Sequence, residues 1–497
     1  MLPRVYLVGC ALLAVVGTVS AQTLDPNIPR AWDDKEVEGL EVALAARDRS
    51  PRYPNAAEYY SLKVRKIYRS YPVYIEGKEP PGYIESLKQR EPEIIFDASK
   101  LRTKQDWIQA GKVVFEAEIS FRPASPQPGG TPVPPGFSLP ASPTGVLPGF
   151  IPGYSYIVRK KGELEVGINS CAGCHTRAMP DGSLLEGAQG NLNLIGRHPG
   201  SRKPPTSGPA VQQMKDNQWV LFGAPWVTKK EDFEASITAE ELIRCREAAS
   251  QSGFVFARQG TSLTHPPRIP SLIGVEDIRY LDATGLQHHR SIGDLMRYAI
   301  INEGLDTLAH FGDFQPSPHQ TGASGEEGTR FSDEQLYALA LYIYSLKPPP
   351  NPNSMDGSAR RDQHIFEQQG CNECHTPPLY TNNKLTPAMG FKVPEDLRKT
   401  VDILDVSVGT DPTLALETRR ATGFYKVPSL RGVWYRNGFG HNGQASTLEE
   451  WFDPARLRDG YVPKGFHLGA GPIKGHEFGL GLTSGDRQDL IAFLKTL

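Results

Sequence analysis

The pentapeptide Cys-Asn-Glu-Cys-His occupies residues 371–375, and a second one, Cys-Ala-Gly-Cys-His, occupies residues 171–175. Two thiols at this spacing can add across the vinyl groups of a haem, and the histidine that follows can bind the iron. A Cys-x-x-Cys pair alone would also suit a redox disulfide or half of a zinc site. The histidine directly after both pairs favours haem, so the sequence predicts two covalently bound haem c groups. The expected attachment residues are Cys171, Cys174, Cys371 and Cys374, and the expected proximal iron ligands are His175 and His375.

The two pentapeptides lie in halves of the chain that repeat one order of motifs. Pro-Ser-Leu-x-Gly-Val occurs at 270–275 and again at 428–433, and both halves close with an amphipathic helix that ends in Ser-Leu or Thr-Leu. Duplication of one mono-haem helical domain explains these parallels together. We therefore expect a mainly α fold with two cytochrome c-like haem domains, long loops, a small β-hairpin and an N-terminal extension.

Proline and glycine mark the domain boundaries. The run Pro-Pro-Pro-Asn-Pro-Asn begins at residue 348 and predicts a linker, because it suits neither a helix interior nor a central strand. The expected parts are an N-terminal extension at 22–100, a first haem domain at 101–347, the linker at 348–355 and a second haem domain at 356–497.

The first domain has an inserted loop. Residues 123–153 are about half proline and glycine, which predicts an ordered surface loop or a flexible flap. The stretches at 154–158 and 163–166 follow it and predict the β-hairpin. The extension at 22–100 is rich in tyrosine and proline, and we expect it to wrap around the domains and not to fold alone.

The N-terminus predicts export. Arg4 precedes an apolar run that closes with Val-Ser-Ala before Gln22, which is typical of a cleaved secretory signal at 1–21. A lipoprotein signal ending at Cys10 is an alternative. Covalent haem attachment belongs to exported compartments, so we expect the bacterial periplasm. No later stretch is apolar enough to cross a bilayer, and the net charge of -2 does not favour a nucleic acid partner.

The second half resembles a known family. Phe-Tyr-Lys-Val-Pro-Ser-Leu-Arg at 424–431 and His-Asn-Gly at 441–443 fit the pattern of the di-haem cytochrome c peroxidases, including their methylamine-utilisation branch and the related di-haem oxygenases. The resemblance is good over 356–497, looser over 101–347 and absent over 22–100.

The resemblance implies separate roles for the two haems. It implies that the haem at His175 reacts with hydrogen peroxide, while the haem at His375 relays electrons from a small donor protein, a cytochrome or a cupredoxin. It also implies a Ca²⁺ ion between the domains. The expected calcium ligands are backbone oxygens near Arg436 and Gly438 and the side chain of Asn191 or Asn193.

The chain departs from the family pattern around the first haem. Typical peroxidases have Trp-Asp-Gly-Arg where this chain has His-His-Arg-Ser at 288–291, and Tyr298 stands where they have a glutamine. The family's glutamate has no counterpart that we can place. Splitting an O–O bond needs a titratable group over the open face of the iron. The candidates from the sequence are His288, His289, Glu303 and His310.

The second haem lacks the methionine ligand of the family, because Ala455 occupies its position. His476 is the first candidate for the sixth iron ligand and His467 is the second. A structural role of His476 before the last helix is the alternative. An iron with two histidine ligands has a lower potential than one with histidine and methionine, so a lower-potential donor is expected.

Three functions fit these observations. The first is peroxide reduction with electrons from the small redox protein. The second is oxidation of an organic substrate, which the missing glutamate and the inserted loop favour. The third is a di-haem electron carrier without catalysis, in which His198, His288 or Met179 would bind the first iron.

Overall fold

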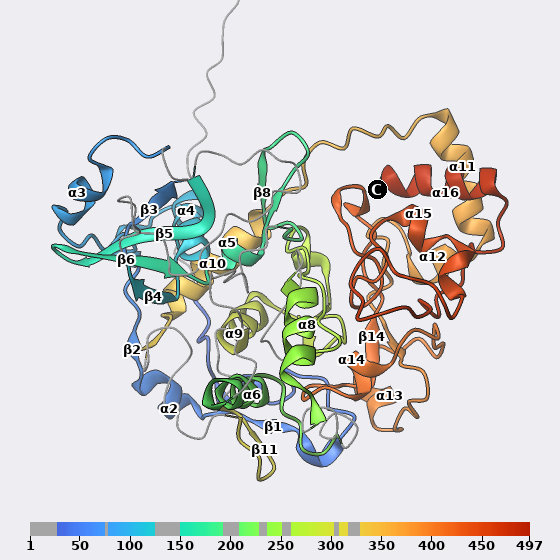
Figure 1. Ribbon diagram of the computed structural model, residues 1–497, viewed down its shortest axis with the longest axis horizontal. Coiled ribbons are helices and arrows are strands. Elements are labelled where there is room, and N and C mark those ends of the chain that lie inside the picture. The colour runs from blue at the N-terminus through green and yellow to red at the C-terminus, as the bar shows by residue number, and fades with distance from the viewer. Residues whose placement is uncertain are drawn as a thin grey trace, which may run out of the picture.

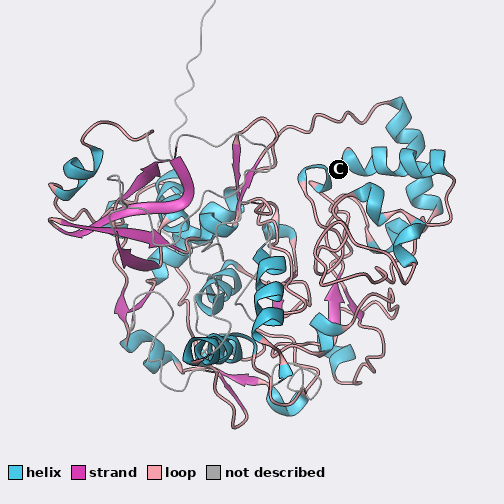
Figure 2. Cartoon of the chain, viewed as in Figure 1, coloured by secondary structure: helices cyan, strands magenta, loops and turns pink. Residues whose placement is uncertain are grey.

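The computed structural model describes residues 27–74, 78–124, 150–191, 208–227, 236–250, 260–302, 308–316 and 329–497. Over these residues the protein is mainly helical with small sheets, which confirms the predicted fold class (Figure 1, Figure 2). Within this part of the chain no helix is long and apolar enough to cross a membrane. The expected signal peptide and most of the inserted loop lie outside the described residues.

The same helix pair forms the frame of each half. The longer helices of the first half are α4 (Lys104–Glu116), α6 (Pro209–Phe222), α8 (Ala239–Ser250), α9 (Ile292–Asn302) and α10 (Asp333–Ser345), and those of the second half are α11 (Gly357–Gln368) and α16 (Ser484–Lys495). The helix ahead of each pentapeptide packs on the last helix of its half, α4 on α10 and α11 on α16. At the first crossing, a Cβ on Gly111 would lie 1.9 Å from the carbonyl oxygen of Ala338, so only glycine permits this close approach.

The predicted β-hairpin is confirmed and is the centre of a larger sheet. Strands β5 (Phe150–Lys160) and β6 (Glu163–Ile168) are antiparallel, with Tyr156 opposite Val166. Strands β3 (Ser70–Tyr74) and β4 (Ser120–Pro123) flank them in the order β3-β5-β6-β4. The other strands form two-stranded pairs: β1 (Pro51–Arg52) with β11 (His310–Phe311), β2 (Lys63–Val64) with β12 (Thr329–Arg330), β7 (Thr176–Ala178) with β8 (Leu184–Glu186), β9 (Tyr280–Leu281) with β10 (Gln287–His288), and β13 (Leu385–Pro387) with β14 (Phe424–Lys426).

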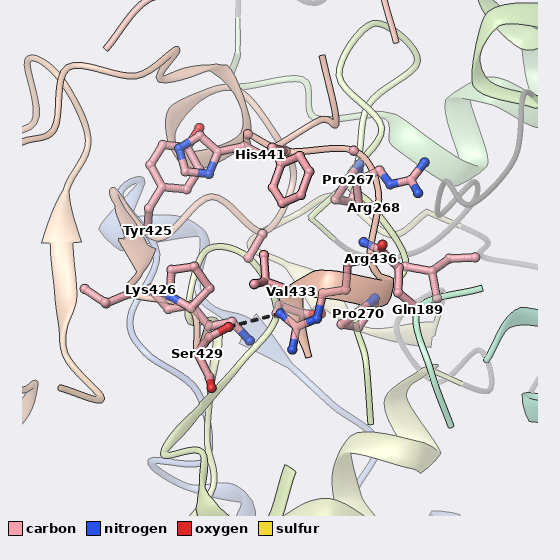
Figure 3. Close-up of a pocket in the computed structure, with 18 of the residues that line it drawn as sticks. Gln189, Pro267, Arg268, Pro270, Tyr425, Lys426, Ser429, Val433, Arg436 and His441 are labelled. Atoms are coloured by element: carbon pink, nitrogen blue, oxygen red, sulfur yellow. Dashed lines mark hydrogen bonds between the residues drawn. The ribbon is translucent and has the colours of Figure 1, made fainter. Parts of the chain in front are cut away.

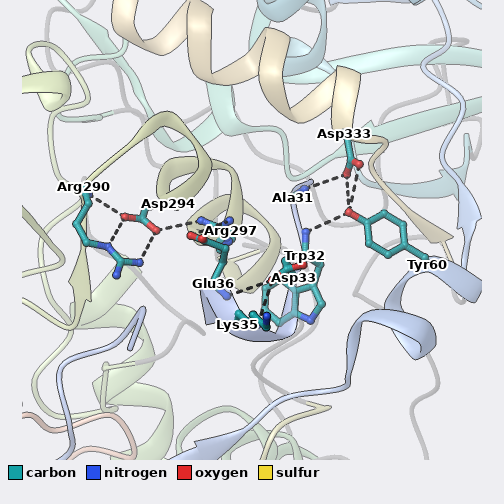
Figure 4. A network of polar contacts seen from close by, with 10 residues as sticks. All are labelled: Ala31, Trp32, Asp33, Lys35, Glu36, Tyr60, Arg290, Asp294, Arg297 and Asp333. Carbon is teal, nitrogen blue, oxygen red and sulfur yellow. Dashed lines mark hydrogen bonds and ion pairs between the residues drawn. The ribbon is translucent and has the colours of Figure 1, made fainter. Parts of the chain in front are cut away.

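The N-terminal segment contributes to the core of the first half. Trp32 is 0% exposed and belongs to one apolar cluster with Phe115 of α4 and Leu336 of α10. The Tyr60 hydroxyl donates to the carboxylate of Asp333, which also accepts from a backbone N–H of the segment (Figure 4). Because these residues bury apolar surface against α4 and α10, the N-terminal segment is part of the hydrophobic core of the first half.

Residues 40–47 form a strap between the two halves. The Val42 N–H donates to the carbonyl of Leu286 in the first half at 2.8 Å. The neighbouring carboxylate, Glu41, pairs with Arg420 of the second half, whose side chain is 0% exposed. A charged group this deeply buried needs its partner, so the ion pair ties the strap to the second half.

Candidate functional site

Each pentapeptide forms one helical turn, α5 (Cys171–Cys174) and α12 (Cys371–Cys374). The Ser170 hydroxyl caps α5 by accepting the Gly173 N–H at 3.0 Å. The other turn, α12, begins after Gly370, whose φ of 70° is left-handed. Residues three apart in a helical turn share one face, so the two thiols of each pair point the same way. None of these thiols is in a disulfide.

The histidine after each thiol pair is oriented by a backbone carbonyl. Nδ1 of His175 lies 3.0 Å from the carbonyl oxygen of Pro270, and Nδ1 of His375 lies 3.1 Å from that of Pro428. A carbonyl oxygen only accepts, so the ring proton is on Nδ1 and the lone pair that binds metals is on Nε2. Both prolines open the repeated Pro-Ser-Leu motif. The duplication therefore preserves a backbone acceptor for each histidine, a role that the sequence repeat does not reveal.

Both pentapeptides line one cavity. Its volume is about 640 Å³, and all four thiols and both histidines lie on its wall. One face of α9 adds Leu295, Tyr298, Ala299 and Asn302 to the wall. Loops of both halves complete it, as Figure 3 shows for Pro270 and Ser429. The lining is mostly apolar, as expected for a site that takes a large flat ligand.

Half-buried cations project from this wall. Arg268, Lys426 and Arg436 all line the cavity (Figure 3). Burial lowers the pKa of Arg268 to about 9 and that of Lys426 to about 8. The Arg436 Nε is buried and has no hydrogen-bond partner. Among the described residues of the wall, Asp282 is the only carboxylate, so the cavity has an excess of positive charge.

His476 shares this cavity with His375. Their ring centroids are 6.4 Å apart, with 56° between the ring planes. Metal–imidazole bonds are about 2.0 to 2.1 Å long, and a ring centroid lies about 1.1 Å behind the bonded nitrogen, so two imidazoles on opposite sides of one ion have centroids about 6.3 Å apart. The observed separation matches this value. The second choice, His467, is exposed, bonds the carbonyl of Gly465 and does not line the cavity.

The local structure of His476 also suits a ligand. Its Nδ1 is buried without a hydrogen-bond partner. Burial, and then the nearby His375 ring, lower its pKa to about 3, so the ring is neutral. Its φ of 47° is left-handed, a conformation that non-glycine residues adopt at a cost and that is enriched at functional sites.

The histidines predicted to serve the first haem do not lie on the cavity wall. His288 is in β10 with its ring against Tyr280, and His310 is in the short strand β11. His289 is buried, with one ring nitrogen on a backbone carbonyl and the other on a tyrosine hydroxyl, both at 2.7 Å. Glu303 lies outside the described residues. These histidines therefore do not supply the titratable group of the cavity. The wall instead carries Asp282 and Tyr298, of which only Tyr298 was noted from the sequence.

The groups predicted to bind calcium are engaged elsewhere. The Asn191 side chain bonds both the N–H and the carbonyl of Ala178, at 2.8 and 3.0 Å, and Asn193 lies outside the described residues. The Arg268 guanidinium donates to the backbone and side-chain oxygens of Asn437, where the ion was expected. A guanidinium at this point repels a cation, so the structure does not support the calcium prediction. In the described part of the chain, no three His, Cys, Asp or Glu side chains are grouped to hold a metal ion.

Comparison with known proteins gives distant likenesses. No protein-family profile and no curated protein matches the chain. Among solved structures, the chain is similar to the hydrazine synthase of Kuenenia stuttgartiensis, with a TM-score of 0.27 and 16% identity. It is also similar to a MauG-like protein associated with microbial copper homeostasis, with a TM-score of 0.32 and 16% identity. Each match covers 59% of this chain and 90% of the other.

Proposed function

We propose that the chain is a periplasmic di-haem c-type cytochrome that reduces hydrogen peroxide with electrons from a small redox protein. The observation that carries this proposal is the single cavity into which both Cys-x-x-Cys-His turns face. The resemblance of residues 424–431 and 441–443 to the di-haem cytochrome c peroxidases supports it independently.

The residues of the cavity fit two haems. Four thiols in two helical turns would form the thioether bonds, and His175 and His375 would bind the two irons through Nε2. Haem has two propionate carboxylates, and the half-buried cations of the wall, together with the buried, unbonded Nε of Arg436, would offer them counter-charge. A bound haem would supply an iron that exchanges electrons and can take a ligand at an open position.

The two centres differ, and under this proposal they would have different roles. At the second centre, His476 would close the iron and leave it to transfer electrons. Of the described residues of the wall, the first half contributes no histidine or methionine besides His175. His198, one of the ligands considered for this iron, lies outside the described residues. The first centre would therefore keep an open face for peroxide, and the second would receive electrons from the donor.

Intact mass and donor oxidation test the proposal. The mature protein, made in a host that attaches haem c, is expected to begin at Gln22 and to carry two haems. Alanine variants of each thiol pair should each lose one haem, whereas Cys245→Ala, at a buried thiol outside the cavity, should retain both. The loaded protein should oxidise a reduced small cytochrome or cupredoxin only when peroxide is added. Fewer than two attached haems, or no peroxide-dependent oxidation of either donor, would contradict the proposal.

A further inference from the structure

Asp282 is a half-buried acid with an unusual position on the cavity wall. It lies in the turn between β9 and β10, and its φ of 65° is left-handed. Aspartate tolerates this conformation in turns, so the backbone alone does not indicate a function. Its position on the cavity wall does indicate one, because every other carboxylate among the described residues lies off the wall. Among the described residues of the wall, Asp282 is therefore the carboxylate that can accept a proton from a ligand in the cavity.

Tyr298 orients this carboxylate. Leu295, Tyr298, Ala299 and Asn302 follow a spacing of three and four residues, which puts them on one face of α9, and all four line the cavity. The Tyr298 hydroxyl donates to Oδ1 of Asp282 at 2.5 Å. With its proton directed at the carboxylate, the hydroxyl presents lone pairs to its surroundings. Asp282 and the Tyr298 hydroxyl can therefore both accept a hydrogen bond from a ligand in the cavity. The tyrosine proton is already donated to Asp282 and is not donated to that ligand.

A lysine from the second half lies beside this carboxylate. Lys426 lines the cavity, and its N–H donates to the carbonyl of Ala283, directly after Asp282, at 3.0 Å. Its ammonium group interacts favourably with the Asp282 charge. The same β14 strand leads into Pro428, the acceptor for His375. The pair of Asp282 and Tyr298 is therefore in contact with the second half as well as the first.

We propose that Asp282, oriented by Tyr298, is the proton-transfer group of the first centre. This inference rests on the proposed function. With haem bound, the carboxylate would take the proton from one peroxide oxygen and give it to the other as the O–O bond breaks, so that the second oxygen leaves as water. The haems would supply the two electrons and the donor protein would replace them. With two further protons from solvent, the first oxygen would also leave as water.

Cyanide binding tests this step without turnover. Hydrogen cyanide must lose its proton to bind ferric iron, so a base in the cavity accelerates its association. In the ferric protein loaded with both haems, Asp282→Asn should slow cyanide association on the order of 100-fold, the usual scale of general base catalysis. Tyr298→Phe keeps the Asp282 carboxylate but removes the hydrogen bond that orients it, so this variant should slow cyanide association by roughly tenfold. The matched control is Tyr344→Phe, which removes a tyrosine hydroxyl bonded to His289 away from the wall and should leave the rate unchanged.

The outcomes separate this inference from the proposed function. Asp282→Asn protein that carries both haems and binds cyanide at the wild-type rate would refute the assignment of the base and leave the di-haem enzyme intact. Equal slowing in the Tyr344→Phe control would also refute it, because a general structural effect would then explain the rates. Wild-type protein that lacks the haems, or that carries both and binds no cyanide, would refute the proposed function together with this inference. If Asp282→Asn does not accumulate, Tyr298→Phe decides the question through the same rate.

Discussion

Removing the His476 imidazole should open the second iron. The 6.4 Å between its ring centroid and that of His375 differs from the value of about 6.3 Å for two ligands of one ion by less than the spread of about 0.2 Å expected for real metal–ligand distances. A bis-histidine iron has no vacant position, so wild-type protein should bind cyanide at the first centre alone. His476→Ala should bind it at both centres.

His476→Met should keep the second iron closed and change its potential. Thioether ligation raises the potential of a haem, and axial ligands tune it over about 0.8 V. We expect a rise on the order of 0.1 V, which is about 2.3 kcal/mol for one electron and is easily measured. His467→Ala is the matched control, because this histidine is exposed and does not line the cavity, and it should leave both properties unchanged.

Electron paramagnetic resonance and a redox titration would measure these effects in protein whose mass shows both haems. The second iron should be low-spin in wild type, high-spin in His476→Ala and low-spin again, at a raised potential, in His476→Met. A second iron that stays low-spin in His476→Ala, with an unchanged potential and no additional cyanide, would show that another group binds it. The match in ring separation would then be a coincidence of packing.

Three further predictions concern stability and assembly. Glu41→Ala should lower the free energy of unfolding by about 3–5 kcal/mol, because it removes the carboxylate that pairs with the fully buried Arg420; chemical denaturation of Glu41→Ala and the milder Glu41→Gln would show it. Gly190→Ala would put a Cβ 1.9 Å from a carbonyl oxygen of the first thiol helix and should impair haem attachment there, whereas Gly481→Ala, with open space around its Cβ, should not; intact mass distinguishes them. Burial raises the pKa of Asp294, but its hydrogen bonds and arginine charges lower it on balance, so the stability it contributes is present above its ordinary value near 3.8 and is lost as the pH falls through the lower folded value (Figure 4). Asp294→Asn should therefore lower the melting temperature at pH 7, and the difference from wild type should disappear below the folded pKa.

The sequence predicts what depends on local chemistry. The thiol pairs and their histidines are contiguous, so their geometry follows from one helical turn. The hairpin around Tyr156 and Val166 was predicted from two short β-prone stretches, and the structure pairs these residues as expected. The fold class followed from a repeat that can be read without any knowledge of long-range contacts.

Residues that reach the cavity through long-range contacts were not predicted. His288 and His310 are candidates by residue type alone, and in the structure they lie in short strands and not on the cavity wall. Asp282 reads as an ordinary turn residue, because aspartate is common in turns and nothing nearby in the sequence shows the partner on α9. Tyr298 was marked only by its position in the family pattern. Its contact with Asp282 spans sixteen residues and depends on how α9 packs.

The two halves share some residues around their thiol pairs and differ in others, and what each proposed haem centre requires explains which residues are shared. A thiol pair, a histidine and a carbonyl acceptor are needed wherever haem c is held, and both halves retain them in the same order. The side of each centre that lies across from this histidine has no such shared requirement. In the second half a loop residue, His476, stands beside the proximal histidine at the separation of two ligands, whereas in the first half α9 presents a tyrosine joined to a carboxylate. Under the proposed function, the first centre would transfer protons as well as electrons and the second would transfer electrons only. This difference between the two linings is the one that such a division of roles requires.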